Sequence, residues 1–171
     1  MLDIYKLGED VLYTPTEKVK KFDSALKMLI DAMFDTMDEA DGVGLAGPQV
    51  GVSQKLFVVD DRKGNRIAFI NPEIIETSVE VGPYEEGCLS VPGYNDKVQR
   101  YERCTVEYQD LEGNKQIFDN VDGLLAICLQ HEIDHLHGKV FVDKLSRLKR
   151  ERVHKKYAKY VKDLKAQKEG Q

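Results

Sequence analysis

The spacing of apolar residues predicts two helices, one on each side of a region of strands. Between Ser24 and Ala40 apolar residues recur at intervals of three and four, as they do on one face of a helix, and Asp23 can cap its start. Between Gly123 and Gly138 almost every position is apolar. A helix that is apolar nearly all round is buried, so we expect this one to lie at the centre of the molecule.

Short runs rich in Val, Ile, Phe and Thr predict strands between these helices. Asn71-Pro72 is expected to separate the second strand from the third, and a turn at Glu112–Asn114 is expected to join two later strands as a hairpin. The predicted strands are Lys55–Asp60, Arg66–Ile70, Glu73–Val81, Val98–Asp110 and Lys115–Phe118, with a further short strand at Val140–Val142.

Three other segments complete the predicted fold. Asp41–Gly51 holds four glycines and a proline, which excludes a helix or a long strand. Residues 1–22 are expected to form an irregular arm, and a third helix is expected from Ser146 to about Gln167. These elements favour an α+β fold, with mainly antiparallel sheets packed around a central helix and with N-terminal and C-terminal helices.

Length and composition narrow the class of protein. A chain of 171 residues fits one domain, residues 1–171, with a sizeable core. No apolar run approaches the length of a membrane span, and the first residues lack the apolar core of a signal peptide, so we expect a cytoplasmic protein with no membrane partner. The three cysteines are too few and too far apart for a disulfide framework. In a reducing compartment, a functional cysteine is then a metal ligand or a nucleophile.

Charge is unevenly distributed along the chain. The formal net charge is −5, but residues 146–171 contain ten Lys or Arg against three Asp or Glu, which leaves +7 on this segment and −12 on the rest. A basic helix on an acidic body is suited to an anionic partner. On charge alone, a solvated basic helix without a partner is an equal alternative.

The central helix carries a candidate metal site. His131 and His135 are four residues apart, so both imidazoles project from one face of a helix. Two such imidazoles can hold one metal ion, with Glu132 as a general base. From this helix alone, two buried histidines bonded to backbone carbonyls remain an equal alternative, because His-Glu-x-x-His is a short pattern and buried polar groups need partners of some kind.

A hydrolytic metal site needs a third protein ligand and an open position. A third histidine downstream is excluded because position 141 is Phe, and the only downstream glutamates lie on the basic segment. Upstream, Cys88 lies in Glu86-Gly-Cys-Leu-Ser-Val-Pro92, where a thiolate would be a strong ligand. Cys104 and Cys128 are weaker candidates, since their positions in a predicted strand and helix are typical of core residues.

Three motifs then occur in a fixed order: Gly42-Val-Gly-Leu-Ala-Gly-Pro-Gln49, Glu86-Gly-Cys-Leu-Ser90 and His131-Glu-Ile-Asp-His135. In order and approximate spacing they resemble the three motifs of bacterial peptide deformylase, and the similarity covers nearly the whole chain. The resemblance implies removal of the formyl group from the formyl-methionine of nascent polypeptides. Water activated by a metal ion would attack the formyl carbon and release formate.

The resemblance assigns the metal and its ligands. By resemblance, Cys88, His131 and His135 bind one divalent ion, which is iron(II) in cells and can be replaced by zinc, nickel or cobalt. Such an ion lowers the pKa of a bound water. Glu132 would take the proton of that water and deliver it to the leaving amine.

The resemblance also assigns the groups that meet the substrate. The side-chain amide of Gln49 and the N–H of Leu89 would stabilise the negative oxygen that develops during attack. The expected residues from the central helix share one face by their spacing, which itself favours an apolar pocket beside the metal. For any one of them, ordinary core packing is the alternative. The expected substrate-binding residues are Val43, Gly44, Tyr84, Glu86, Gly87, Leu124, Ile127 and Cys128.

Some positions depart from the family pattern. Gly47 stands where many members have an alanine, and we expect it to loosen the glycine loop. Asn95 stands where some members have an arginine that helps to hold the substrate backbone, so peptide anchoring is expected to differ. Beside the metal motif, Asp134 is expected to pair with Arg100.

The family also suggests a partner. In bacterial members the terminal helix docks the enzyme on the ribosome, and the charge of residues 147–168 suits that role; we also expect a monomer. Two other classes remain open from the sequence: another metal-dependent peptidase or amidohydrolase with a His-Glu-x-x-His site, and an RNA-binding protein with a structural metal. The first lacks a downstream third ligand, and the second gives no role to Gln49 or Glu132.

Overall fold

The computed structural model describes the whole chain, residues 1–171. The helices are α1 (Ser24–Glu39), α2 (Gly123–Leu136) and α3 (Arg147–Glu169), and the short 3-10 helices are η1 (Asp10–Tyr13), η2 (Gly47–Val50) and η3 (Phe141–Lys144). The strands are β1 (Gly44–Ala46), β2 (Leu56–Asp60), β3 (Arg66–Thr77), β4 (Val81–Cys88), β5 (Val91–Tyr101), β6 (Arg103–Gln109) and β7 (Lys115–Asp122).

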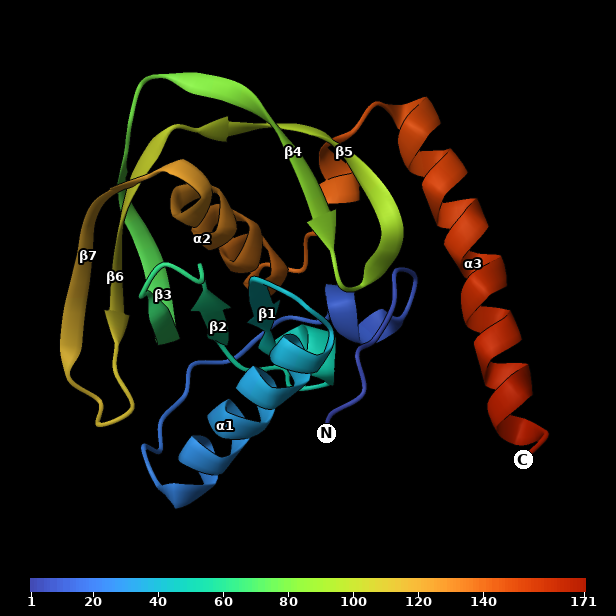
Figure 1. Cartoon of the computed structure of the whole chain (residues 1–171), viewed down its shortest axis with the longest axis horizontal. Coiled ribbons are helices and arrows are strands. Elements are labelled where there is room, and N and C mark those ends of the chain that lie inside the picture. Colours follow the sequence, from blue (N-terminus) through green and yellow to red (C-terminus); the bar gives the residue numbers. More distant parts are fainter.

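Two antiparallel sheets lie on either side of α2 (Figure 1). The larger sheet has the strand order β1-β2-β3-β6-β7, and β4 and β5 form a separate hairpin. All of these strands pair in antiparallel fashion. The predicted α+β fold, with antiparallel sheets around a central helix and a helix towards each end of the chain, is therefore confirmed.

Strand β2 explains why the larger sheet is covered on both faces. Successive side chains of a strand point to opposite faces. Phe57 and Val59 join the apolar cluster that includes α2, whereas Leu56 and Val58 join the cluster that includes α1. All four are buried, and each such burial contributes about 1.5–3 kcal/mol. The sheet is thus held between α1 and α2, which fixes the position of α2.

A third apolar cluster attaches α3 to the hairpin. Val153 and Tyr157 of α3 are buried together with Val91 and Val98 of β5. The Tyr157 hydroxyl also donates a hydrogen bond to the carbonyl of Pro92. In Figure 1, the rest of α3 runs along the edge of the molecule, and most of its residues after Tyr157 are exposed.

The predicted helices are confirmed with small shifts at their ends. α1 begins at Ser24, and the carboxylate of Asp23 accepts a hydrogen bond from the N–H of Leu26. The Ser146 side chain caps α3 in the same way. α2 ends just before Gly138, whose φ of +72° is typical of a glycine that terminates a helix. None of these helices combines the length and the apolar character that a membrane span requires.

Three strand predictions are wrong. Glu73–Val81 is not a separate strand, because its first residues continue β3, which ends at Thr77, and Val81 begins β4. Val98–Asp110 is not one strand, because β5 ends at Tyr101 and β6 begins at Arg103, so the chain leaves the hairpin for the larger sheet at Glu102. Val140–Val142 is not a strand either. These residues are buried, but Val140 caps η3, and Phe141 and Val142 are its first two residues.

Asn71-Pro72 bends a strand rather than ending it. β3 continues through this point to Thr77, and its register with β6 shifts there. Asn71 has a φ of +50°. Its side chain accepts from the N–H of Val19 and donates to the carbonyl of Val19 and to Gln109 Oε1. The predicted separation of two strands is therefore a β-bulge that ties the N-terminal arm to the larger sheet.

Candidate active site

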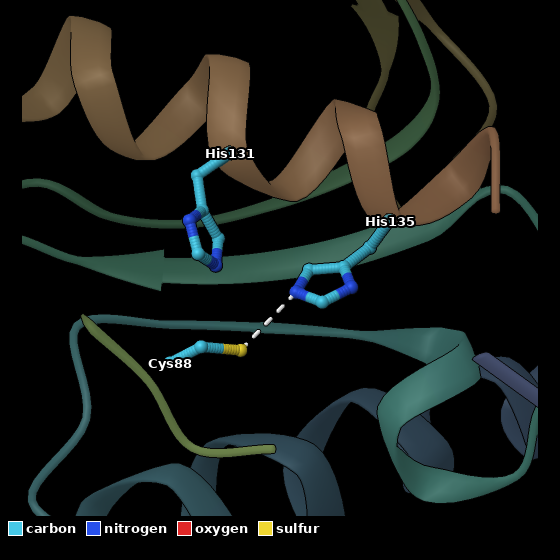
Figure 2. Close-up of side chains that lie close together, drawn as sticks. All are labelled: Cys88, His131 and His135. Atoms are coloured by element: carbon cyan, nitrogen blue, oxygen red, sulfur yellow. Dashed lines mark hydrogen bonds between the residues drawn. The ribbon is translucent and has the colours of Figure 1, made fainter. Parts of the chain in front are cut away.

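α2 and the hairpin bring together three side chains that could hold a metal ion. Cys88 ends β4, and His131 and His135 reach towards it from successive turns of α2 (Figure 2). One donor atom of each lies within 4.8 Å of the others, and Cys88 Sγ is 3.4 Å from His135 Nε2. One thiolate and two imidazoles suit a single transition-metal ion. The donor set and its spacing therefore fit one bound metal ion.

Glu86 orients the first histidine. His131 Nδ1 lies 2.8 Å from Glu86 Oε1, and a proton shared there leaves Nε2 free to bind a metal. Burial acts to lower the pKa of His131, but hydrogen bonds with Cys88 and Glu86 raise it well above the ordinary value. Burial, followed by the nearby charge of His131, lowers the pKa of His135 well below the ordinary value.

Arg100 of β5 holds Glu86 in this position. Its Nε and Nη2 donate to the two Glu86 oxygens at 2.6 and 2.8 Å, and its Nη1 donates to Asp134 at 2.6 Å. Burial acts to raise the pKa of Glu86, but the hydrogen bonds from Arg100 and His131 keep it below the ordinary value. The predicted pairing of Arg100 with Asp134 is confirmed. Arg100 also holds Glu86, and Glu86 in turn contacts His131.

Glu132 carries an oxygen with no partner. Its Oε1 lies 4.0 Å from His131 Nε2, and its Oε2 is buried without a hydrogen bond. Burial raises the pKa of Glu132 to about 7. Gly44 leaves room for this carboxylate, because a Cβ at position 44 would lie 2.6 Å from Oε1. A buried polar atom left unpaired costs about 1–3 kcal/mol. An unpaired oxygen of this kind is typical of a group that is kept available for a bound molecule.

Gln49 is held with its amide beside the ligand cysteine. Its Oε1 accepts from the N–H of Ala46 at 2.9 Å, and its Nε2 donates to Ser90 Oγ at 3.1 Å and lies 3.4 Å from Cys88 Sγ. The N–H of Leu89, in the turn after Cys88, donates to no other group of the chain. The Gln49 amide is thus directed at Cys88 and Ser90, and the Leu89 N–H beside them is a donor without a partner in the chain.

These groups open into a cavity of about 510 Å³. One wall is Asp41–Gly44 with Gln49, and a second wall is Glu85–Leu89 with Pro92-Gly93. The residues that α2 contributes to the lining are Leu124, Ile127, Cys128, His131 and Glu132.

Comparison with known proteins identifies the family. The sequence model described as polypeptide deformylase matches residues 1–151. The chain belongs to the polypeptide deformylase family. The peptide deformylase of Chromobacterium violaceum is 49% identical over 161 residues, which cover 93% of this chain and 95% of that protein.

Solved deformylases have the same fold. A peptide deformylase from Legionella pneumophila superimposes with a TM-score of 0.89 at 46% identity, covering 97% of this chain and 98% of that one. A peptide deformylase from Ehrlichia chaffeensis in complex with actinonin has a TM-score of 0.88 at 40% identity, covering 94% and 97%. As a member of the deformylase family, the chain is a hydrolase that removes the N-terminal formyl group, and the alternative of another peptidase is not favoured.

Most substrate-binding residues expected from the sequence line the deformylase cavity. Tyr84 is the exception: it lies on β4 opposite Val98 of β5 and is not part of the lining, which β4 enters only from Glu85 onwards. Leu124 is 55% exposed, so the expectation that α2 is buried on all sides fails at its first turn, where Leu124 lines the cavity. The residues that do line the cavity are Val43, Gly44, Glu86, Gly87, Leu124, Ile127 and Cys128.

Two contacts at the site escaped the sequence prediction. Ser90 accepts a hydrogen bond from Gln49, and its only signal was its place two residues after Cys88 in the motif. The bidentate pairing of Arg100 with Glu86 depends on how β4 and β5 align. Because β4 had not been predicted as a strand, that alignment could not be derived.

The two departures from the family pattern have structural explanations. Gly47 does not loosen the loop: it is buried, and a Cβ there would lie 2.8 Å from the carbonyl oxygen of Val52 and 3.0 Å from that of Gln54. Glycine at this position therefore permits a tighter approach of two backbones. Asn95 lies on β5 beside Gly87, and its side chain occupies the space that a side chain at Gly87 would need.

Proposed function

We propose that the cavity binds the formylated amino terminus of a nascent polypeptide and that Glu132, Gln49 and Leu89 carry out its deformylation. The observation that supports this is the unpartnered, buried carboxylate oxygen of Glu132 beside the ligand set Cys88, His131 and His135. A metal held by these three residues supplies a Lewis acid that polarises a carbonyl oxygen and acidifies water.

The residues of the chain then have separate tasks. Glu132 takes the proton of the attacking water and returns it to the amine that leaves. Its Oε2 is free to accept that proton because it has no hydrogen-bond partner in the chain. The Gln49 amide and the Leu89 N–H donate to the negative oxygen that forms on the former formyl carbon. Ser90 and the N–H of Ala46 hold the Gln49 amide in place, so it need not reorganise during the reaction.

The peptide itself is proposed to bind as an added strand. β1 is the edge of the larger sheet, and β4 is paired on one side only, by β5. Gly44 of β1 and Glu85–Gly87 of β4 both line the cavity. Open strand edges present unpaired N–H and C=O groups that an extended peptide can bond. The methionine side chain is proposed to pack against Leu124, Ile127 and Cys128, which line the cavity.

Formate release tests this proposal. Anaerobically prepared protein should release formate from formyl-Met-Ala-Ser, and Glu132→Ala should lower kcat at least a hundredfold while its metal content is retained. Gln49→Leu should lower kcat by a similar factor through loss of a donor to the oxyanion. No formate from the wild-type protein, or an undiminished Glu132→Ala variant, would contradict the assignment.

Iron(II) is proposed as the metal in cells, with zinc, nickel or cobalt as substitutes. Mixed thiolate and imidazole ligands accept all of these ions. Metal analysis of protein purified without oxygen checks the native ion. Reconstitution of the chelated protein with each ion, followed by the formate assay, checks the substitutes; activity with none of the four would be inconsistent with this proposal.

The ribosome is proposed as a partner of α3. All ten cationic residues after Ser146 lie on this helix, and phosphate contacts give affinity that falls with salt. Substituting Lys155, Lys159 and Lys162 by Gln alters one exposed face and retains the buried Val153 and Tyr157. This variant should bind ribosomes at least tenfold more weakly, with unchanged turnover of formyl-Met-Ala-Ser.

A matched control removes the same charge elsewhere. Lys18, Lys20 and Lys21 are exposed on the N-terminal arm, and their triple Gln variant should bind ribosomes like the wild type. Equal loss in both variants would show a non-specific charge effect. We also propose that residues 1–171 act as one domain and as a monomer in the cytoplasm, since a single chain supplies the whole cavity; sedimentation of the active protein checks the monomer.

A further inference from the structure

The lining of the cavity includes two exposed carboxylates, and only one of them has a cationic partner. Four acidic residues line the cavity, and no Lys or Arg does. Glu132 is at the metal end, and Glu86 is neutralised by Arg100. That leaves Asp41 and Glu85, both exposed, one on each of the two segments that line the cavity with α2.

Arg62 pairs with Asp41 from outside the cavity lining. Its Nη2 donates to Asp41 Oδ1 at 2.5 Å, and the two side chains are 57% and 85% exposed. The turn between β2 and β3 presents Arg62 with a φ of +57°. Asp60 Oδ1 fixes that conformation by accepting the N–H of Arg62 at 2.7 Å.

The position of this pair determines which part of the substrate it meets. Gln49, Cys88 and Leu89 surround the formyl group, and α2 takes the methionine side chain. Asp41 and Glu85 are the exposed acidic residues of the remaining lining, so we infer that the residues that follow formyl-methionine pass close to them. This step rests on the proposed function.

We propose that Arg62 is a specificity-determining residue of this enzyme: by masking Asp41, it decides how strongly the cavity discriminates between basic and acidic residues after formyl-methionine. A fixed charge at the mouth of a cleft acts mainly on charged substrates and on their rate of capture. With Arg62 in place, the lining has one exposed carboxylate that is unmasked, Glu85. Without it, the lining has two.

The test compares three peptide amides, formyl-Met-Ala-Xaa with Lys, Gln or Glu as the third residue. Relative to the Gln peptide, Arg62→Gln should raise kcat/KM for the Lys peptide about threefold and lower it for the Glu peptide about threefold, as expected for one exposed ion pair. Arg62→Lys should restore the wild-type ratio. Asp41→Asn should shift the ratio in the opposite direction, and 0.5 M salt should diminish each shift.

Lys63→Gln is the matched control. It removes one charge from the same exposed turn, where the hydrogen bond to Asp61 comes from the backbone N–H of Lys63 and survives the substitution. This variant should keep the wild-type ratio of Lys to Glu peptides. An unchanged ratio in Arg62→Gln, or the same change in Lys63→Gln, would overturn the role of Arg62. Failure of the proposed function is separate, because the wild type would then release no formate from the neutral Gln peptide.

Discussion

Gly44 lies so close to the Glu132 carboxylate that a larger residue at position 44 would clash with it. The missing Cβ at position 44 lets the carboxylate lie against β1, with Oε1 2.6 Å from where that Cβ would be. Gly42 has a comparable role, since its Cβ would lie 2.7 Å from Leu89 Cδ1. At the scale of residues, these glycines serve close packing around the reacting groups, and neither has a positive φ that would require glycine.

Gly44→Ala is therefore expected to displace the Glu132 carboxylate. A misplaced general base costs about a hundredfold in turnover, so kcat for formyl-Met-Ala-Ser should fall by that factor while the far-UV circular dichroism and metal content stay unchanged. Gly82→Ala is the control, because a Cβ at position 82 would lie 3.4 Å from Tyr84 Cε2, an ordinary van der Waals distance. Full activity in Gly44→Ala would show that Glu132 can move without loss.

Arg100→Gln tests the buried charges behind the metal ligands. Arg100 and Glu86 are 3% and 4% exposed, and an uncompensated buried charge costs about 3–5 kcal/mol. Urea unfolding of the metal-free variant should show a loss in that range. Metal affinity should also fall about 10–100-fold, because the carboxylate that orients His131 is no longer held.

The control for this variant is Arg103→Gln. Arg103 is half exposed and lies 3.7 Å from Asp122, so its loss should change the free energy of unfolding by less than about 1 kcal/mol. An equally small effect in Arg100→Gln would show that Glu86 and Asp134 are stable without their partner.

At the scale of elements, the sequence predicted the helices better than the strands. α1 and α2 have clear apolar patterns and end signals, whereas β4 and β5 alternate weakly and contain Gly82, Pro83 and Gly93. The register of a hairpin depends on cross-strand contacts that a single sequence does not display. For that reason, the sequence identifies Cys88 as a candidate metal ligand but does not show that it ends a strand of the hairpin.

The bulge in β3 gives a test at this scale. Asn71→Ala removes three hydrogen bonds to Val19 and Gln109 and places alanine at a φ of +50°. We expect a loss of about 2–4 kcal/mol in the free energy of unfolding, with kcat unchanged because the bulge lies outside the cavity lining. Asn71→Gly should recover the part of the loss that comes from backbone strain. A loss below 1 kcal/mol in Asn71→Ala would contradict this account.

At the scale of the whole molecule, the clustering of Cys88, His131 and His135 could be predicted because these residues occur in motifs. The three motifs alone predict that Cys88, His131 and His135 share one site. The Asp41–Arg62 pair and the position of Tyr84 could not be predicted, because both depend on how separate elements pack. Sequence patterns report chemistry and periodicity, whereas these contacts follow from tertiary geometry.

Removing the metal should affect stability as well as turnover. A ligand that binds only the folded chain stabilises it by about 2.7 kcal/mol at a concentration of 100 Kd. Chelation should therefore lower Tm, and re-addition of the ion should restore both Tm and formate release. The Cys88→Ser variant should have a Tm that barely responds to chelation; a wild-type response in that variant would remove Cys88 from the ligand set.

The sequence separations at the site also bear on when a newly made copy of this enzyme becomes active. Cys88 and His135 are 47 residues apart, and Gln49 and Cys88 are 39 apart. During synthesis the glycine loop emerges first, the cysteine follows, and both histidines arrive only with α2. Contacts between such distant segments form late because long loops must close first. Each molecule must therefore have synthesised α2 and packed it against the hairpin before it can acquire its metal, so metal loading follows the synthesis of all three motifs.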